Sequence, residues 1–118
     1  MVELEAPSIS SLAREIGTSA FVAESVPFVL GCLPFLPQLG FLPLLKEVIS
    51  CGGDTDTNAS LVGQICGAAV GRSGLPRAEV EAVETLEGTA ELVKRFSAFA
   101  AECASRQSAD ASTTFWRV

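Results

Sequence analysis

The sequence predicts an all-α fold, a compact domain of about five to six helices around a central buried helix at residues 56–71. Three observations favour this fold. Apolar residues recur at helical spacing in successive segments of the chain, glycine and proline separate those segments, and no run alternates between apolar and polar residues as a half-buried strand does. With 118 residues, 48% of them hydrophobic, the chain is long enough for one domain. We expect this domain at 1–104 and a flexible tail at 105–118.

The first helices are short and end at glycine or proline. Residues 8–16 place four apolar side chains on one stripe, and Gly17 follows where a helix commonly ends in a left-handed residue. A second helix is expected at 26–33, with Pro27 in its first turn and Pro34 at its end. A third covers 41–49 and closes at Cys51 and the two glycines that follow.

The central helix has the least polar composition. Between residues 58 and 71 its only polar side chains are Asn58, Ser60 and Gln64, which predicts that it is enclosed on every side. Small residues recur at every fourth position and predict close approach of another backbone. They are Ala59, Gly63, Gly67 and Gly71.

Beyond residue 76 we expect an acidic amphipathic segment at 77–87, a break at Gly88 and a last helix. One face of that helix carries Leu92, Phe96, Phe99 and Cys103. On its solvent side, Glu91 and Arg95 have the spacing of an ion pair. In the tail, Phe115 and Trp116 are a candidate docking anchor.

The composition excludes several classes of function. The net charge is −6 with no histidine. This argues against binding to a nucleic-acid backbone, and it rules out Ser-His-Asp or Cys-His catalysis and a typical zinc site within this chain. The four cysteines form no C-x-x-C pair and are expected to be buried, reduced thiols. Since the first residues carry glutamates and no basic residue, a cytoplasmic location is expected.

An uncharged run of 21 residues at 25–45 is long enough to span a membrane. It contains four prolines and two glycines, which would interrupt the backbone hydrogen bonds repeatedly in lipid. We therefore expect two short buried helices joined by a proline-rich bend, and no membrane association.

The candidate chemistry lies at residues 52–58. Two glycines permit a tight turn, after which Asp54, Asp56 and Thr57 place two carboxylates and a hydroxyl at the start of the central helix. Such oxygen donors suit Mg²⁺ or Mn²⁺. A purely structural role explains the same residues, with Asp54 or Thr55 as the helix N-cap and Asp56 favourable against the helix dipole.

Residues 52–59, Gly-Gly-Asp-Thr-Asp-Thr-Asn-Ala, and the small-residue helix after them resemble the C-terminal metal motif of the ADP-ribosylglycohydrolase family. Residues 17–27 are similar to the loop and helix start that precede this motif. The resemblance implies an all-α fold with two Mg²⁺ or Mn²⁺ ions that hydrolyses the bond between ADP-ribose and an acceptor. It implies that Asp54, Asp56 and Thr57 ligate metal. It further implies that the ADP-ribose cleft is lined by Gly17, Thr18, Ser19 and Phe21. For these cleft residues, a self-bonded loop and, for Phe21, ordinary core packing stay open as alternatives.

The family's other metal ligands lie in a Gly-Asp-x-x-Gly segment and a Thr-Asp-Asp-type segment, and neither occurs in these residues. The chain thus looks like the C-terminal portion of the family's enzymes, without an assigned catalytic residue. Three hypotheses follow. The chain is an ADP-ribosyl hydrolase completed by a complementary chain or a second copy in a homo-oligomer, an inactive remnant that binds ADP-ribose or a protein, or a helical oligomerisation module.

Overall fold

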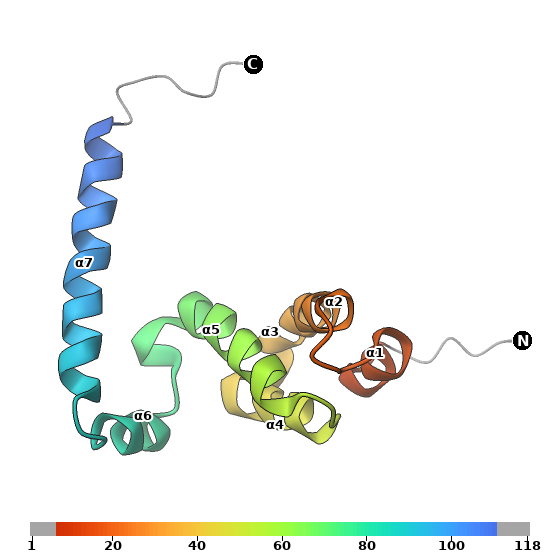
Figure 1. Ribbon diagram of the computed structural model, residues 1–118. Helices are drawn as coiled ribbons and strands as arrows, with labels where there is room; N and C mark the ends of the chain where they lie inside the picture. The colour runs from red at the N-terminus through yellow and green to blue at the C-terminus, as the bar shows by residue number, and fades with distance from the viewer. Residues whose placement is uncertain (1–6, 111–118) are drawn as a thin grey trace, which may run out of the picture. The chain divides into compact units, whose positions relative to one another are not determined.

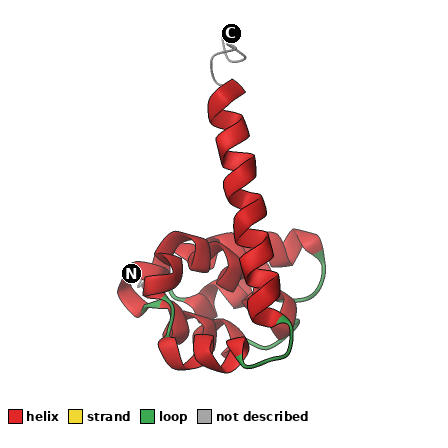
Figure 2. Cartoon of the chain, turned by 90° about the vertical axis from the view of Figure 1, so that its left-hand side faces the viewer, coloured by secondary structure: helices red, strands yellow, loops and turns green. Residues whose placement is uncertain are grey.

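The computed structural model describes residues 7–110, and every regular element in that part of the chain is a helix (Figures 1 and 2). This confirms the all-α prediction. The chain divides into two compact units between Pro76 and Arg77, and each is described by itself. The first unit contains α1 (Ile9–Ile16), α2 (Val22–Cys32), the 3-10 helix η1 (Leu33–Phe35), α3 (Leu36–Leu39), α4 (Phe41–Ser50) and α5 (Thr55–Gly74). The second contains α6 (Arg77–Glu84) and α7 (Thr89–Asp110).

The core of the first unit lies where α2, α4 and α5 meet, with α1 packed on α2. Its buried apolar side chains are Ile9, Phe28, Val29, Cys32, Leu44, Val48, Val62 and Cys66. They come from four helices, so no one helix pair forms this core alone. The side of α5 that bears Val62 and Cys66 therefore holds the unit together, and the start of the same helix carries the candidate metal ligands.

Helix α1 begins and ends as the sequence predicts. The Ser8 hydroxyl accepts a hydrogen bond from the Ser11 N–H at 3.1 Å, and the Ser11 hydroxyl accepts one from the Ser8 N–H at 3.0 Å. This reciprocal pair satisfies two backbone donors that the helix leaves free. The helix ends at Gly17, whose φ of 92° is one that side-chain-bearing residues rarely adopt.

The apolar run at 25–45 forms the predicted pair of helices, α2 and α4, joined by η1 and α3. Helix α2 begins at Val22, earlier than predicted, so Pro27 lies inside it and not in its first turn. The missing N–H of Pro27 leaves the carbonyl of Ala23 without its helical partner, which is tolerable because both residues are exposed. Gly40, at a φ of 81°, separates α3 from α4.

By length and composition alone, the stretch Val22–Leu39 is apolar enough to cross a membrane, with a mean hydropathy of 1.4. The core helix of a soluble protein meets the same criterion. In this stretch Phe28, Val29 and Cys32 are buried in the core of the first unit. The expectation that the chain does not associate with a membrane stays a prediction.

Helix α5 is central to the first unit, but it is buried on one side only. Asn58, Val62 and Cys66 are buried, whereas Ile65 is 43% exposed. The prediction of enclosure on every side was therefore wrong. The apolar composition of α5 comes largely from alanine and glycine, and such small residues leave little apolar surface to protect when they face solvent.

The small-residue ridge of α5 meets side chains at ordinary contact distance, and not the closely approaching backbone that the sequence predicts. A Cβ added at Gly63 would contact the Leu45 side chain at 3.7 Å, and one at Gly67 would contact Phe41 at 3.8 Å, so this ridge faces α4. Gly71 differs because nothing lies within 4 Å of it. Its φ of 66° interrupts the helix there, close to the predicted end at residue 71.

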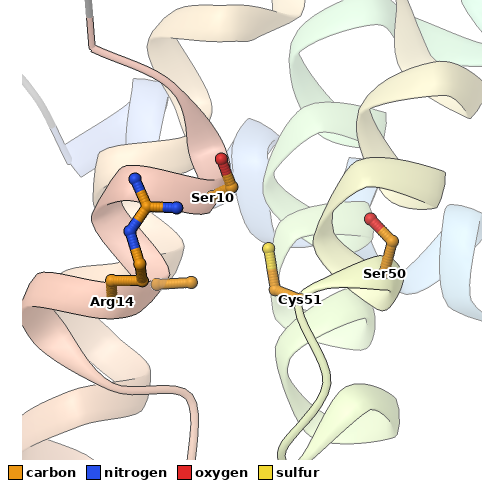
Figure 3. Close-up of a pocket in the computed structure, with 5 residues that line it drawn as sticks. Ser10, Arg14, Ser50 and Cys51 are labelled. Carbon is orange, nitrogen blue, oxygen red and sulfur yellow. The ribbon is translucent and has the colours of Figure 1, made fainter. Parts of the chain in front are cut away.

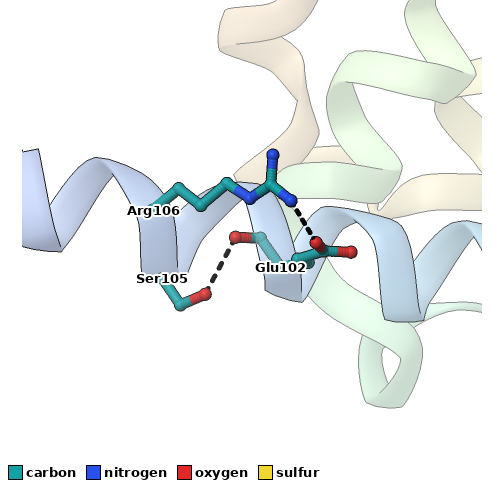
Figure 4. Close-up of polar contacts among 3 residues, drawn as sticks. All are labelled: Glu102, Ser105 and Arg106. Carbon is teal, nitrogen blue, oxygen red and sulfur yellow. Dashed lines mark hydrogen bonds and ion pairs between the residues drawn. The ribbon is translucent and has the colours of Figure 1, made fainter.

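In the second unit, Gly88 separates α6 from α7 at a φ of 80°. Helix α7 continues to Asp110, so residues 105–110 are helical where a flexible tail was expected. The candidate anchor, Phe115 and Trp116, lies outside the described residues. Near the end of α7 the Arg106 guanidinium pairs with the Glu102 carboxylate at 2.5 Å, and the Ser105 hydroxyl donates to the Glu102 carbonyl at 2.8 Å (Figure 4).

Candidate metal centre

The three predicted metal ligands lie at the N-terminal end of α5. Asp54 occupies the N-cap position, yet its side chain makes no capping hydrogen bond. The helix starts through backbone groups, with the Asn58 N–H donating to the Asp54 carbonyl at 3.0 Å. Asp56 and Thr57 follow in the first turn and are exposed. The Asp54 carboxylate thus does not cap the helix, although Asp56 lies in the first turn, as the structural alternative also expects.

The turn before α5 is fastened to the loop after α1 through one carbonyl group. The Thr18 carbonyl accepts the Asp54 N–H at 2.8 Å and the side-chain amide of Asn58 at 2.9 Å. Gly53, at a φ of 75°, lies against Thr18 so closely that an added Cβ would overlap the Thr18 hydroxyl and carbonyl oxygens. A glycine is therefore required here for both its backbone conformation and its lack of a side chain.

Asn58 is a positioning residue that the sequence analysis did not assign to the site. Its side chain is 1% exposed, and while its amide nitrogen is bonded to Thr18, its Oδ1 atom is buried without a hydrogen-bond partner. A buried polar atom left unpaired is costly, so its retention calls for a reason. The signal in the sequence was a single asparagine on the buried stripe of an otherwise apolar helix.

The electrostatics at the start of α5 favour negative charge on Asp56. A hydrogen bond from the Asp54 carboxyl lowers the pKa of Asp56, and the backbone N–H groups of Thr57 and of Asp56 itself lower it further. These N–H groups lie at the positive end of the helix dipole. Two neighbouring carboxyl groups form an oxygen-rich pair, which is the donor chemistry that Mg²⁺ and Mn²⁺ prefer.

The loop predicted to line the ADP-ribose cleft is held by Glu24, a second positioning residue that the sequence analysis missed. The Glu24 carboxylate accepts the Ser19 hydroxyl at 2.6 Å and the Ser19 N–H at 3.1 Å, and these bonds lower the pKa of Glu24. Ser19 therefore belongs to a self-bonded loop, one of the alternatives considered above. Its hydroxyl also accepts the Phe21 N–H at 3.3 Å.

Phe21 is the N-cap residue of α2 and is 63% exposed, so it is not a core residue. The core-packing alternative for Phe21 was wrong, and its ring is open to a ligand. Gly17 lies against the Glu24 carboxylate, which a Cβ at this position would overlap. Among the predicted cleft residues, Thr18 is joined by hydrogen bonds to the turn that contains Asp54.

Within residues 7–110, no group of three or more His, Cys, Asp or Glu side chains is placed to hold a metal ion. As ligands, the two carboxylates and the Thr57 hydroxyl would fill only part of the six-coordinate shell of Mg²⁺. A separate surface depression of about 300 Å³ lies between α1 and the end of α4 (Figure 3). It is lined by Ser10, Ala13, Arg14, Ser50 and Cys51, and it includes none of the predicted metal ligands.

The sequence profile described as ADP-ribosylglycohydrolase matches residues 2–109. The chain belongs to the ADP-ribosylglycohydrolase family. No curated protein and no solved structure matches it. Membership of the ADP-ribosylglycohydrolase family favours an activity of that type, and the family is generally metal-dependent. The match covers both units, including α6 and α7, and therefore extends well beyond the Asp54 turn.

Proposed function

We propose that this chain supplies the Asp54 side of a metal-dependent ADP-ribosyl hydrolase site that removes ADP-ribose from an acceptor. The observation that carries the proposal is the Asp54 carboxyl, which occupies the N-cap position without capping the helix and lies next to the exposed Asp56 and Thr57. A capping role does not account for the Asp54 side chain, because a capping aspartate bonds to backbone N–H groups of the first turn.

In this proposal Asp54 and Asp56 ligate Mg²⁺ or Mn²⁺ through their carboxylates, and Thr57 does so through its hydroxyl. The metal supplies Lewis-acid polarisation of the ribose and activation of a water molecule. Asn58 and Thr18 hold the carboxylate turn in place through their hydrogen bond. The exposed Phe21 ring offers a surface on which the adenine or ribose of ADP-ribose packs.

The remaining metal ligands and the general acid or base are proposed to come from a complementary chain, a second copy or a missing N-terminal segment. Two carboxylates and one hydroxyl bind a divalent ion weakly, since affinity rises with the number and charge of the ligands. The proposed protein is cytoplasmic, consistent with its four free thiols, and it binds neither membranes nor a nucleic-acid backbone, consistent with its net charge of −6.

Calorimetric titration with MnCl₂ tests the metal site. We expect weak binding to the unmodified chain and none to the double variant Asp54→Ala, Asp56→Ala. Glu79→Ala is the matched control, since Glu79 is an exposed acidic residue of α6 in the second unit. Release of ADP-ribose from arginine-linked and serine-linked peptides is then measured with Mn²⁺ present. Metal binding that survives in the double variant, or no binding to the unmodified chain, would contradict the proposal.

A second candidate function is an inactive module that binds ADP-ribose or a protein. It is favoured because no larger metal-ligating cluster exists among residues 7–110 and because many large apolar side chains are exposed. In this case ADP-ribose raises the melting temperature without metal, by mass action on the folded state. An unchanged melting curve at saturating ADP-ribose counts against this candidate.

A further inference from the structure

Helix α7 carries an apolar face that nothing in the second unit covers. Leu92 is 66% exposed, Phe96 68% and Phe99 62%, and Val93 beside them is 48% exposed. Such an array of large apolar side chains on one helix marks an interaction surface. We call the set Leu92, Phe96, Phe99 and Cys103 the α7 seam.

The seam residues are spaced by four, three and four positions, which is the heptad spacing of a coiled coil. In heptad notation Phe96 and Cys103 are a positions, and Leu92 and Phe99 are d positions. The rest of the 22-residue helix is rich in alanine, a strong helix former. At 1.5 Å per residue, the seam is about 17 Å long and covers residues 92–103, because the flanking heptad positions hold the polar Thr89 and Arg106.

The charged residues beside the seam distinguish between the two ways in which two copies of α7 can pair. Arg95 and Glu102 both occupy g positions, and within residues 7–110 no ion pair is formed by Arg95, although Glu91 lies at the spacing expected for one. In a parallel pair, g residues face e positions of the partner, and the facing residues are the uncharged Ala100 and Gln107.

In an antiparallel pair, g residues face g residues. With Phe96 opposite Phe99 of the second copy, Leu92 lies opposite Cys103, and Arg95 lies opposite Glu102. By symmetry the same contacts occur twice, so that two ion pairs between the copies flank four apolar layers. Each Glu102 carboxylate, which pairs with Arg106 of its own helix, then also accepts Arg95 of the other copy. The e positions, Val93 and Ala100, also face each other in this arrangement and are both apolar.

We propose that the α7 seam binds α7 of a second copy of this chain in an antiparallel coiled coil, with Arg95 of each copy paired to Glu102 of the other. The charge complementarity selects the second copy as the occupant and fixes the antiparallel direction. The proposal rests only on α7 and is independent of the metal site, so it stands or falls separately from the proposed hydrolase function.

Sedimentation equilibrium of the full chain measures the association. We expect a dimer, and we expect Arg95→Glu to weaken it about tenfold because two attractions become two repulsions. Adding Glu102→Arg to that variant restores opposite charges and recovers the dimer. Lys94→Glu is the matched control, since it makes the same charge change at position f, on the side of the helix away from the seam, and it leaves the dimer unchanged.

Disulfide trapping reports the direction of pairing, with Cys51→Ser in every variant so that this partly exposed thiol does not react. In the antiparallel arrangement the two Cys103 residues are about 16 Å apart, too far to join, whereas Leu92→Cys lies opposite Cys103 and is trapped by mild oxidation. Any of four results would overturn the proposal. They are a disulfide-linked dimer formed through Cys103 alone, a dimer that Leu92→Cys does not trap, a dimer insensitive to Arg95→Glu, and a monomer at all concentrations.

Discussion

Asn58→Asp provides a sharp test of how the candidate metal turn is held. The substitution keeps the size of the side chain but replaces the amide that donates to the Thr18 carbonyl with an oxygen. At neutral pH this places a carboxylate against a carbonyl oxygen at a position that is 1% exposed, where even the present Oδ1 has no partner. Leaving a buried charge unpaired costs about 3–5 kcal/mol of folding free energy.

The comparison with Asn58→Ala isolates the charge. This variant also loses the bond to Thr18, but it buries no charge and removes the unpaired oxygen. We expect it to lose about 1–2 kcal/mol, because the Thr18 carbonyl keeps its bond to the Asp54 N–H. Urea unfolding of the two variants and the unmodified chain measures both values.

The pH dependence gives a second, independent readout of Asn58→Asp. Burial raises the pKa of the introduced carboxyl above its unfolded value of about 3.9. The destabilisation is therefore small below that value, where the protonated carboxyl donates to Thr18, and it grows as the pH rises through it. The reasoning is refuted if Asn58→Asp is no less stable than Asn58→Ala at neutral pH, or if its deficit does not change with pH.

Three further outcomes follow from the geometry. Gly53→Ala should cost about 2–4 kcal/mol in urea unfolding, because its φ of 75° disfavours a side chain and its Cβ overlaps Thr18. Asp54→Ala should raise the pKa of Asp56 toward its ordinary value in a carboxyl NMR titration, since it removes the hydrogen bond that lowers it. The stabilisation from ionised Asp56 is lost as the pH falls through its lowered pKa. Burial raises the pKa of Cys32 to about 12, so iodoacetamide should leave it unmodified in the folded protein at neutral pH.

Each of these outcomes has a control within the chain. Gly52→Ala shares the φ of 75° but meets nothing within 4 Å, so it should cost only about 1–2 kcal/mol. An equal loss at Gly52 and Gly53 contradicts the close contact with Thr18. Glu79→Ala should leave the pKa of Asp56 unchanged. Unfolding in urea should make the buried Cys32 reactive toward iodoacetamide.

Much of the fold could be predicted because glycine and proline mark the ends of the helices. Gly17, Gly40 and Gly88 all adopt positive φ values at such ends, and the fully buried Leu44 and Val48 lie on an apolar stripe visible in the sequence. These features depend on local geometry and on helical periodicity, which one sequence displays directly.

The burial of α5 was not predictable in the same way. Its alanine and glycine residues make the composition apolar. They carry little apolar surface, however, so they do not need to be buried as Leu44 or Phe28 does. The end of α7 differs from the expectation for a related reason. Its serine and alanine residues predict a tail, whereas residues 105–110 are helical, because alanine is the strongest helix former and the Glu102–Arg106 pair supports the last turns.

The sequence predicted the acidic residues of the candidate site, but it did not predict the residues that hold them in place. Asp54, Asp56 and Thr57 are adjacent in the sequence, so a motif reveals them. The contact of Thr18 with Asn58 joins residues 40 positions apart, and only the packing of α1, α2 and α5 brings them together. A single sequence contains no signal for that distance.

The Thr18 carbonyl serves two donors, and this has a thermodynamic consequence for the proposed enzyme. The loop that contains Thr18 is predicted to line the ADP-ribose cleft, and the turn that contains Asp54 carries predicted metal ligands. The Thr18 carbonyl joins the two segments. If ordering of either segment favours ordering of the other, metal and ADP-ribose bind cooperatively, and each increases the affinity for the other by the same factor. A single peptide carbonyl would then set how strongly the cation and the nucleotide depend on each other.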